Sequence, residues 1–199
     1  RVRSSAASDV YKRQVDDLQG LKMRIPGFGG EVLRRNGGTP VAMPGAEIFT
    51  ALQTGTLDAA EWIGPYNDLT FGFHKVAKHY YYPGWHEGGP TLECIVNKEA
   101  YESLPKDLQT IVDIAASATN DSMLAEFMAR NAFALEQIER MDDIKISPFP
   151  KDVMDAFKQA SEEIIAEIIN KDPKFAKIYK SFSDYKNTVE KWTKISEYA

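Results

Sequence analysis

Cysteine is almost absent from this sequence, which contains Cys94 alone. A single cysteine cannot form a disulfide within the chain, and its apolar setting, Leu-Glu-Cys-Ile-Val at 92–96, predicts a buried and unreactive thiol. The three histidines lack the neighbouring cysteine or histidine ligands that are typical of zinc sites. The composition therefore argues against both a disulfide scaffold and a zinc module.

Long apolar runs and an excess of positive charge are missing as well. No run approaches the ~20 residues needed to cross a bilayer, so no transmembrane helix is expected. The formal net charge is −5, with acidic and basic residues mixed along the chain. Nucleic acids and anionic membranes require a basic face that neutralises phosphates, so neither is expected as a partner.

Common motifs for nucleotide binding and acyl transfer are also missing. The segment Gly27-Phe28-Gly29-Gly30 follows a predicted strand, but a dinucleotide fingerprint needs a third glycine where Val32 stands. The sequence contains no Walker motif and no Gly-x-Ser-x-Gly elbow. Phosphate binding therefore does not explain these glycines.

Residues 1–14 differ in character from everything after them. They lack the apolar central region and the small-residue cleavage site of a signal peptide. We expect them to be a non-native leader or scar, and the fold prediction therefore starts at residue 15.

What the sequence does contain is an alternation of strands and helices between residues 20 and 100. Predicted strands cover residues 21–25, 39–43 and 56–63, and predicted helices cover residues 29–35 and 46–54. A β-α-β-α-β order of this kind favours an α/β fold, with a parallel sheet and helices on its faces. An amphipathic helix over residues 68–78 and a strand over residues 91–96 are expected to follow.

The second half of the chain is predicted to be mostly helical. Residues 106–141 contain no proline or glycine and keep apolar residues at helical spacing. A helix of that length would extend about 50 Å, unless it breaks near residues 119–122. A strand over residues 144–150 and helices over 151–170 and from Asp172 onwards complete the prediction. This is more helix than one small sheet needs, which indicates a further portion upstream.

Candidate site residues lie where predicted strands end. In open α/β sheets ligands bind beyond the carboxyl ends of the strands, and Arg24 ends the first strand while Glu61 and Trp62 end the third. A guanidinium can bind a carboxylate through two parallel hydrogen bonds and keeps its charge in a partly desolvated cleft. Arg24 is therefore a candidate carboxylate-binding residue, with a structural ion pair as the alternative.

Glu61 and Glu87 form a candidate pair of carboxylates. Such pairs act as acid and nucleophile in glycosidases, and they also ligate hard cations such as calcium or sodium. A carboxylate-pair hydrolase and a purely structural α/β domain both stay open at this point. For each glutamate the simpler alternative is a cap or a salt bridge, and for Trp62 it is a place in the core.

Four segments resemble one protein family, the extracytoplasmic solute-binding proteins of TRAP transporters, known as the DctP-like family. The segments are KMRIPG at 22–27, EIFTALQTG at 47–55, LDAAEW at 57–62 and YYYPGW at 80–85. The last of them is similar to the subgroup that binds 2-oxo acids together with a metal ion.

The resemblance implies an α/β fold of the periplasmic-binding-protein type, which in the family has two lobes around a cleft. Residues 15–199 would then be the C-terminal portion of such a protein. The expected parts are a second α/β lobe at about 20–100, a long lobe-spanning helix at about 105–141, and a C-terminal strand and helices at about 144–199.

The resemblance also implies roles for the site residues. Arg24 would pair with the carboxylate of a small 2-oxo acid such as pyruvate. Glu61, Trp62 and Glu87 would surround a sodium or calcium ion that bridges to this ligand, with Trp62 acting partly through its main chain. Such a protein is not an enzyme. It resides in the periplasm and delivers its ligand to the membrane subunits of the transporter. The resemblance is also compatible with a homodimer.

Overall fold

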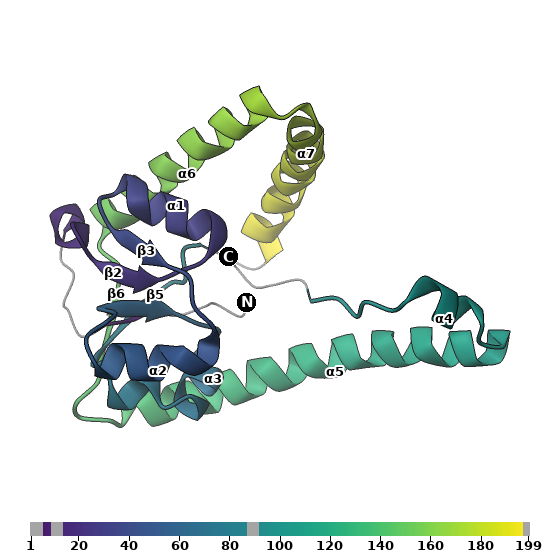
Figure 1. The fold of residues 1–199 in the computed structure, drawn as a ribbon, viewed down its shortest axis with the longest axis horizontal. Helices are drawn as coiled ribbons and strands as arrows, with labels where there is room; N and C mark the ends of the chain where they lie inside the picture. Colours follow the sequence, from purple (N-terminus) through teal and green to yellow (C-terminus); the bar gives the residue numbers. More distant parts are fainter. Residues whose placement is uncertain (1–5, 9–13, 87–91, 197–199) are drawn as a thin grey trace. The chain divides into compact units, whose positions relative to one another are not determined.

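A computed structural model describes residues 6–8, 14–86 and 92–196 of the chain (Figure 1). The chain divides into two compact units, Arg1–Met154 and Asp155–Ala199. Arg24, Glu61 and Trp62 all belong to the first unit. Among the described helices, none is both long enough and apolar enough to cross a membrane.

A mixed sheet of six strands forms the centre of the first unit, as far as the structure describes it. The strands are β1 Ala6–Ser8, β2 Lys22–Arg24, β3 Thr39–Val41, β4 Ala59–Glu61, β5 His79–Tyr82 and β6 Lys145–Pro148. Their order across the sheet is β3-β2-β4-β1-β5-β6. β2 pairs in parallel with β3 and β4, β5 pairs in parallel with β6, and β1 is antiparallel to β4 and β5. All strands except β1 therefore end at the same edge of the sheet.

Short helices connect the strands. They are η1 Val15–Leu18, α1 Gly27–Arg35, α2 Gly45–Gln53, α3 Pro65–Thr70, η2 Phe73–Lys75 and α4 Lys98–Glu102. α1 leads from β2 to β3, and α2 leads from β3 to β4. The predicted β-α-β-α-β order, and the parallel pairing of its three strands, are thus confirmed.

α1 ends where the sequence predicts. At its C-terminus the side chain of Asn36 donates from Nδ2 to the carbonyl of Val32 over 2.9 Å. Gly37 follows with φ 88°, a left-handed conformation that glycine adopts at little cost. Arg34 and Arg35 place positive charge in the last turn, where the helix dipole favours it. The chain then turns back into β3.

One apolar cluster holds α2 against the end of β4. Its buried members are Ile48, Ala51, Leu52, Leu57, Ala60 and Phe73. The members from α2 recur at the three- and four-residue spacing that places them on one face of the helix. Ala60 is buried in this cluster and the half-buried Trp62 packs against it, so the cluster fixes the backbone on both sides of Glu61.

A long helix, α5 Lys106–Glu139, is continuous over 34 residues, so the break considered near residues 119–122 does not occur. Its C-terminal part is docked on α3, where the backbone N–H of Tyr66 donates to Asn131 Oδ1 at 3.0 Å. Ala134 and Ile138 are buried in the same part of the helix. These contacts fix one end of α5 to the sheet-bearing part of the unit.

The N-terminal part of α5 is exposed in the described structure. Gln109 is the one buried side chain among residues 106–122. α4 lies along this part (Figure 1), and Tyr101 donates from its hydroxyl to the carboxylate of Asp113. Exposed apolar side chains on α5 include Leu108, Ile111, Ile114, Leu124 and Met128.

The strand predicted over residues 91–96 is wrong for residues 92–96, which have no regular structure. The strand in this region is β5, which has hydrogen-bonded neighbours on both sides, β1 and β6. Residues 92–96 have no such partner strand, and Ile95 is 85% exposed. Cys94 is exposed as well, so the buried position expected for its thiol is also wrong.

The helix predicted over residues 68–78 is divided into α3 and η2. Gly72 lies between them with φ 75°, which interrupts the helical backbone. α3 also begins earlier than predicted, with Pro65 as its first residue, because proline suits the position whose N–H has no partner inside a helix.

Residues 1–14 were excluded from the fold prediction, and here the structure differs. Ala6–Ser8 forms β1, which fills the position between β4 and β5. The sequence Ala-Ala-Ser carries no alternation of large apolar and polar side chains, which is the signal that identifies a strand. The pairing depends on backbone hydrogen bonds, which sequence patterns do not reveal.

The second unit is helical in its described residues. α6 Lys151–Lys171 begins in the first unit and continues into the second, and α7 Pro173–Ser196 follows it. The predicted start of α7 is confirmed: Asp172 Oδ1 accepts hydrogen bonds from the backbone N–H groups of Lys174 at 2.8 Å and Phe175 at 3.2 Å. The predicted strand before α6 is confirmed as β6.

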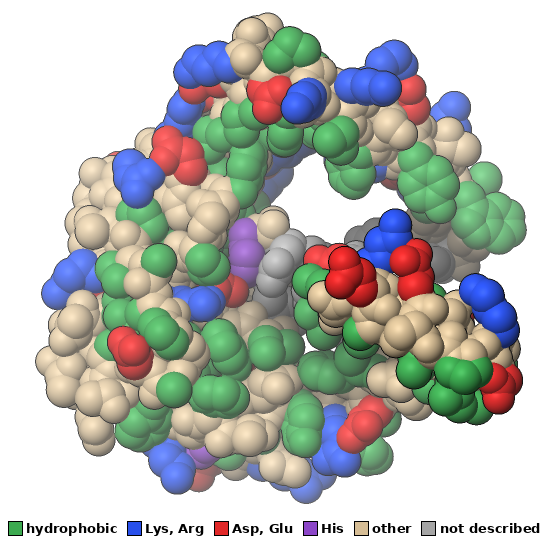
Figure 2. All heavy atoms as spheres, turned by 45° about the vertical axis from the view of Figure 1, so that its right-hand side comes forward, with side chains coloured by type: hydrophobic (Ala, Val, Ile, Leu, Met, Phe, Trp, Pro, Cys, Tyr) green, Lys and Arg blue, Asp and Glu red, His purple; other side chains and the backbone are tan. Residues whose placement is uncertain are grey.

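Charged side chains of both signs are interspersed on the face of the molecule drawn in Figure 2. That face shows no extended basic area of the kind that neutralises a phosphate backbone.

We predict that Ile138→Ala destabilises the chain while the same change at Ile114 has little effect. Ile138 is 1% exposed and Ile114 is 63% exposed on the same helix. Removing buried methyl and methylene groups and leaving a cavity costs about 2–5 kcal/mol, whereas an exposed substitution costs within about 0.5 kcal/mol. Urea unfolding followed by circular dichroism measures both. Equal losses for the two variants would show that α5 is not docked through Ile138.

Candidate functional site

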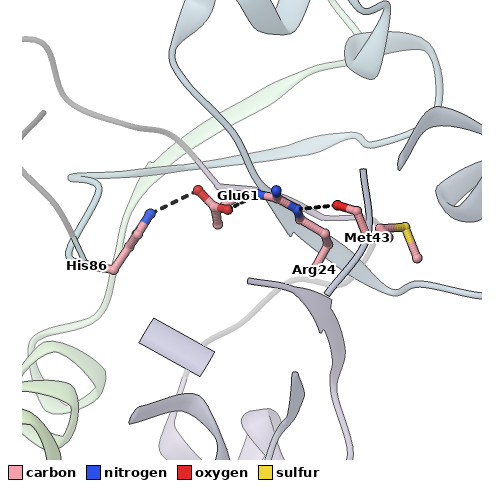
Figure 3. A network of polar contacts seen from close by, with 4 residues as sticks. All are labelled: Arg24, Met43, Glu61 and His86. Carbon is pink, nitrogen blue, oxygen red and sulfur yellow. Dashed lines mark hydrogen bonds and ion pairs between the residues drawn. The ribbon is translucent and has the colours of Figure 1, made fainter. Parts of the chain in front are cut away.

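Arg24 and Glu61 meet at the carboxyl edge of the sheet. Arg24 is the last residue of β2 and lies opposite Ala60 of β4 in the parallel register. Glu61, the last residue of β4, is therefore one step further along the neighbouring strand. As predicted from the strand ends, the two side chains lie side by side (Figure 3).

Arg24 is held by three different groups. Its Nη1 forms an ion pair and hydrogen bond with Glu61 Oε1, and its Nε donates to the carbonyl of Met43 at 3.3 Å. The guanidinium carbon also lies 5.1 Å from the centre of the Trp62 ring, within the range of a cation–π contact. Among the described residues, Nη2 makes no hydrogen bond, so this end of the guanidinium can still donate to a ligand.

Glu61 is a buried carboxylate with a partner on each oxygen. It is 4% exposed. Oε1 accepts from Arg24, and Oε2 lies 2.9 Å from His86 Nε2 (Figure 3). A buried charge is tolerated only when it is paired and hydrogen-bonded, and removing one partner of such a pair typically costs about 3–5 kcal/mol.

Trp62 belongs both to the core and to the site. Its ring packs against Phe71 and Phe73, with centroid distances of 5.2 and 6.3 Å, and it also contacts the Arg24 guanidinium. Gly45 makes room for it, because a Cβ at that position would lie 2.3 Å from Trp62 Cη2. The core position considered for Trp62 and the site position are thus compatible.

The structure brings together three of the four predicted site residues: Arg24, Glu61 and Trp62. Glu87, the fourth, lies outside the described residues. Two contributors were not predicted. Met43 acts through its backbone carbonyl, which no sequence pattern marks, and His86 was considered only as a zinc ligand. The signal available for His86 was its place next to Glu87 in an aromatic segment.

The chemistry of the site suits a hard cation better than zinc. Glu61 offers carboxylate oxygens, the donors that calcium and sodium prefer. Among the described residues, no group of three or more His, Cys, Asp or Glu side chains could hold a metal ion. Glu61 can therefore supply part of a cation site, and further oxygen donors are needed to complete it.

Sequence comparison identifies a similar protein whose name states the class of its ligand. The monocarboxylate 2-oxoacid-binding periplasmic protein of Nostoc sp. is 40% identical over 185 residues, which are 93% of this chain and 50% of that protein. The chain thus spans half the length of this relative.

Two solved structures are similar in fold and sequence. A TRAP periplasmic solute-binding protein from Colwellia psychrerythraea, with bound calcium and pyruvate, has a TM-score of 0.92 and 43% identity. One from Pseudoalteromonas atlantica T6c, with bound sodium and pyruvate, has a TM-score of 0.92 and 42% identity. Each comparison covers 98% of this chain and 60% of the solved chain.

These similarities confirm the predicted α/β fold of the periplasmic-binding-protein type. The model of one protein family matches residues 5–172, which is most of the chain. The strand ends that carry Arg24 and Glu61 fall within that match. The chain therefore belongs to the bacterial extracellular solute-binding proteins, family 7, the DctP family.

Proposed function

We propose that this chain forms part of a TRAP transporter solute-binding protein that captures a small 2-oxo acid, such as pyruvate, together with a sodium or calcium ion. The observation that carries the proposal is the contact between Arg24 and the buried Glu61 at the carboxyl edge of the sheet. Two solved proteins of the same fold also support the proposal, because each is more than 40% identical to this chain and holds pyruvate with calcium or sodium.

Arg24 binds the carboxylate of the ligand in this proposal. The side chain of Arg24 is 13% exposed. Among the described residues, its Nη2 makes no hydrogen bond. The hydrogen bond to the Met43 carbonyl and the contact with the Trp62 ring hold the guanidinium in place without neutralising it. An anion reaching Nη2 therefore meets an oriented, permanently charged donor.

Glu61 binds the cation, with Trp62 contributing through its main chain and Glu87 as a second carboxylate from outside the described residues. When bound, the cation supplies positive charge that both Glu61 and the oxygens of a 2-oxo acid can share. Glu61 is suited to this role because its acceptor oxygens are buried, where attraction between opposite charges is stronger than in water.

The Arg24–Glu61 ion pair links the ligand site to the cation site, and this couples the binding of ligand and cation. A ligand carboxylate draws on the positive charge that Arg24 shares with Glu61, which leaves Glu61 more negative toward a cation. A cation at Glu61 in turn offsets the negative charge beside Arg24. The guanidinium then attracts the ligand carboxylate more strongly while it keeps its hydrogen bond to Oε1. Each partner therefore favours the binding of the other.

The biological setting follows from the family. Its members are transport proteins that bind solutes, so we propose that this chain performs no catalysis, resides in the periplasm and delivers its ligand to TRAP membrane subunits. Neither the family nor the similar proteins support the alternative of a hydrolase that uses Glu61 and Glu87. A homodimer remains a prediction from the resemblance.

The first test of the function is the substitution Arg24→Lys in the complete protein. Lysine keeps the positive charge beside Glu61 but loses the planar donor fork, and a hydrogen bond to a charged group contributes about 1.5–3 kcal/mol. We expect pyruvate binding in the presence of calcium, measured by isothermal titration calorimetry, to weaken about 10- to 100-fold.

The matched control is Arg34→Lys. Arg34 pairs with Glu31 on the surface, with 61% of its side chain exposed, so its replacement should leave pyruvate binding unchanged. Unchanged pyruvate affinity in Arg24→Lys would remove Arg24 from the ligand site, and equal losses in both variants would point to a nonspecific effect.

The second test concerns the coupling of ligand and cation. Pyruvate affinity is measured with and without calcium, and calcium affinity with and without pyruvate. We expect each to tighten the other by the same factor, about 5- to 150-fold, because coupling free energies are reciprocal. Independent binding of the two would contradict coupling through the Arg24–Glu61 ion pair.

A further inference from the structure

His86 is the partner of Glu61 that neither the sequence motifs nor the proposed roles account for. It follows β5, whereas Glu61 ends β4, and β1 lies between these two strands. The side chain of His86 is 11% exposed, and its Nε2 lies 2.9 Å from Glu61 Oε2. A half-buried imidazole therefore reaches from the loop after β5 to the oxygen of Glu61 that Arg24 does not hold.

We propose that His86 is a positioning residue for Glu61, one that fixes the orientation of the carboxylate for cation binding. This inference rests on the proposed function. The terminal torsion of a glutamate is broad and has no sharp preferred angle. One bond from Arg24 to Oε1 leaves the carboxylate free to rotate about that contact, whereas a second bond to Oε2 fixes its plane. The lone pairs left for a cation then point in one direction.

The chemistry of the contact assigns the hydrogen. Glu61, paired with Arg24, is a carboxylate and can only accept hydrogen bonds. His86 must therefore donate from Nε2. An imidazole can do so in its neutral form, so the bond adds no obligatory positive charge beside a cation, as a second arginine or a lysine would.

The packing around His86 shows how its position is fixed. A Cβ at Gly29 of α1 would lie 3.2 Å from His86 Cβ and 2.9 Å from Ile25 Cδ1. The loop that carries His86 thus packs closely against α1 at a residue without a side chain. The Trp85 ring lies at 70° to the imidazole, with 5.5 Å between the ring centres.

This packing also explains Gly29 and Gly30, which the dinucleotide motif does not. Gly29 admits His86, and at Gly30 a Cβ would lie 2.8 Å from the backbone oxygen of Ile25. The segment permits α1 to start directly against the strand end and the His86 loop. Gly29 and Gly30 serve the arrangement of the site rather than the binding of a phosphate.

The test compares two replacements of His86 in the complete protein. His86→Phe keeps a ring of similar shape but removes the donor, and His86→Gln keeps an N–H donor near the position of Nε2. His74→Phe serves as the matched control, because His74 is also partly buried but lies outside the site. Calcium affinity is measured with pyruvate present, pyruvate affinity is measured at saturating calcium, and the melting temperature is measured for every variant.

We expect His86→Phe to weaken calcium binding about 10- to 100-fold, the usual effect of losing a group that orients a metal ligand. His86→Gln should recover most of this loss, and pyruvate affinity at saturating calcium should change by less than about threefold because Arg24 remains in place. The control should match the unmodified protein in both affinities.

Two results would overturn the role of His86: unchanged calcium affinity in His86→Phe, or a loss in His86→Gln as large as that in His86→Phe. A purely structural role would instead lower the melting temperature and weaken calcium and pyruvate together, with no recovery by glutamine. If the unmodified protein binds neither calcium nor sodium in the presence of pyruvate, the proposed function itself fails. These outcomes separate the two proposals.

Discussion

The site depends on one constraint, which is that the buried carboxylate of Glu61 needs a partner on each oxygen. A carboxylate that is 4% exposed has lost most of its hydration, and only charge pairing and hydrogen bonds can replace it. Arg24 provides this replacement from the end of β2, and His86 provides it from the loop after β5. The requirement thereby determines which residues must converge at this edge of the sheet.

The apolar surroundings make the convergence possible. Trp62 packs on Phe71 and Phe73 and presents its face to the Arg24 guanidinium, so the core orients the charged residue. Gly45 and Gly29 are the points where side chains of the site approach a helix closely. A site of high charge is thus supported by aromatic packing and by two residues that have no side chain.

Much of this arrangement could be predicted from the sequence because it depends on local signals. The stop at Asn36 and Gly37 marks the end of α1, and the Asp172 cap marks the start of α7. The parallel pairing of β2 with β4 places Arg24 beside Glu61. The predictions fail where the outcome depends on distant partners. Residues 92–96 have the composition of a strand, but a strand exists only where another strand pairs with it.

The residues of the candidate site also divide into those marked by local signals and those that depend on distant partners. The convergence of Arg24, Glu61 and Trp62 could be predicted because these residues end predicted strands and lie in segments that resemble the family. His86 and the carbonyl of Met43 could not, because their contributions arise from contacts between segments far apart in the sequence. Histidines have many structural roles. Only the distance between His86 and Glu61 distinguishes the role of His86 from the others.

β1 connects two groups of strands in the sheet. Within the described residues, β3-β2-β4 and β5-β6 are joined only through β1, because β4 and β5 both pair with it and not with each other. Neighbouring strands lie about 4.8 Å apart, so β1 separates β4 and β5 by about 10 Å. The side chains of His86 and Glu61, which are 2.9 Å apart at their hydrogen bond, together bridge this separation. The three residues of β1 therefore act as a spacer between β4 and β5. The width of this strand sets the distance that the side chains of Glu61 and His86 have to bridge.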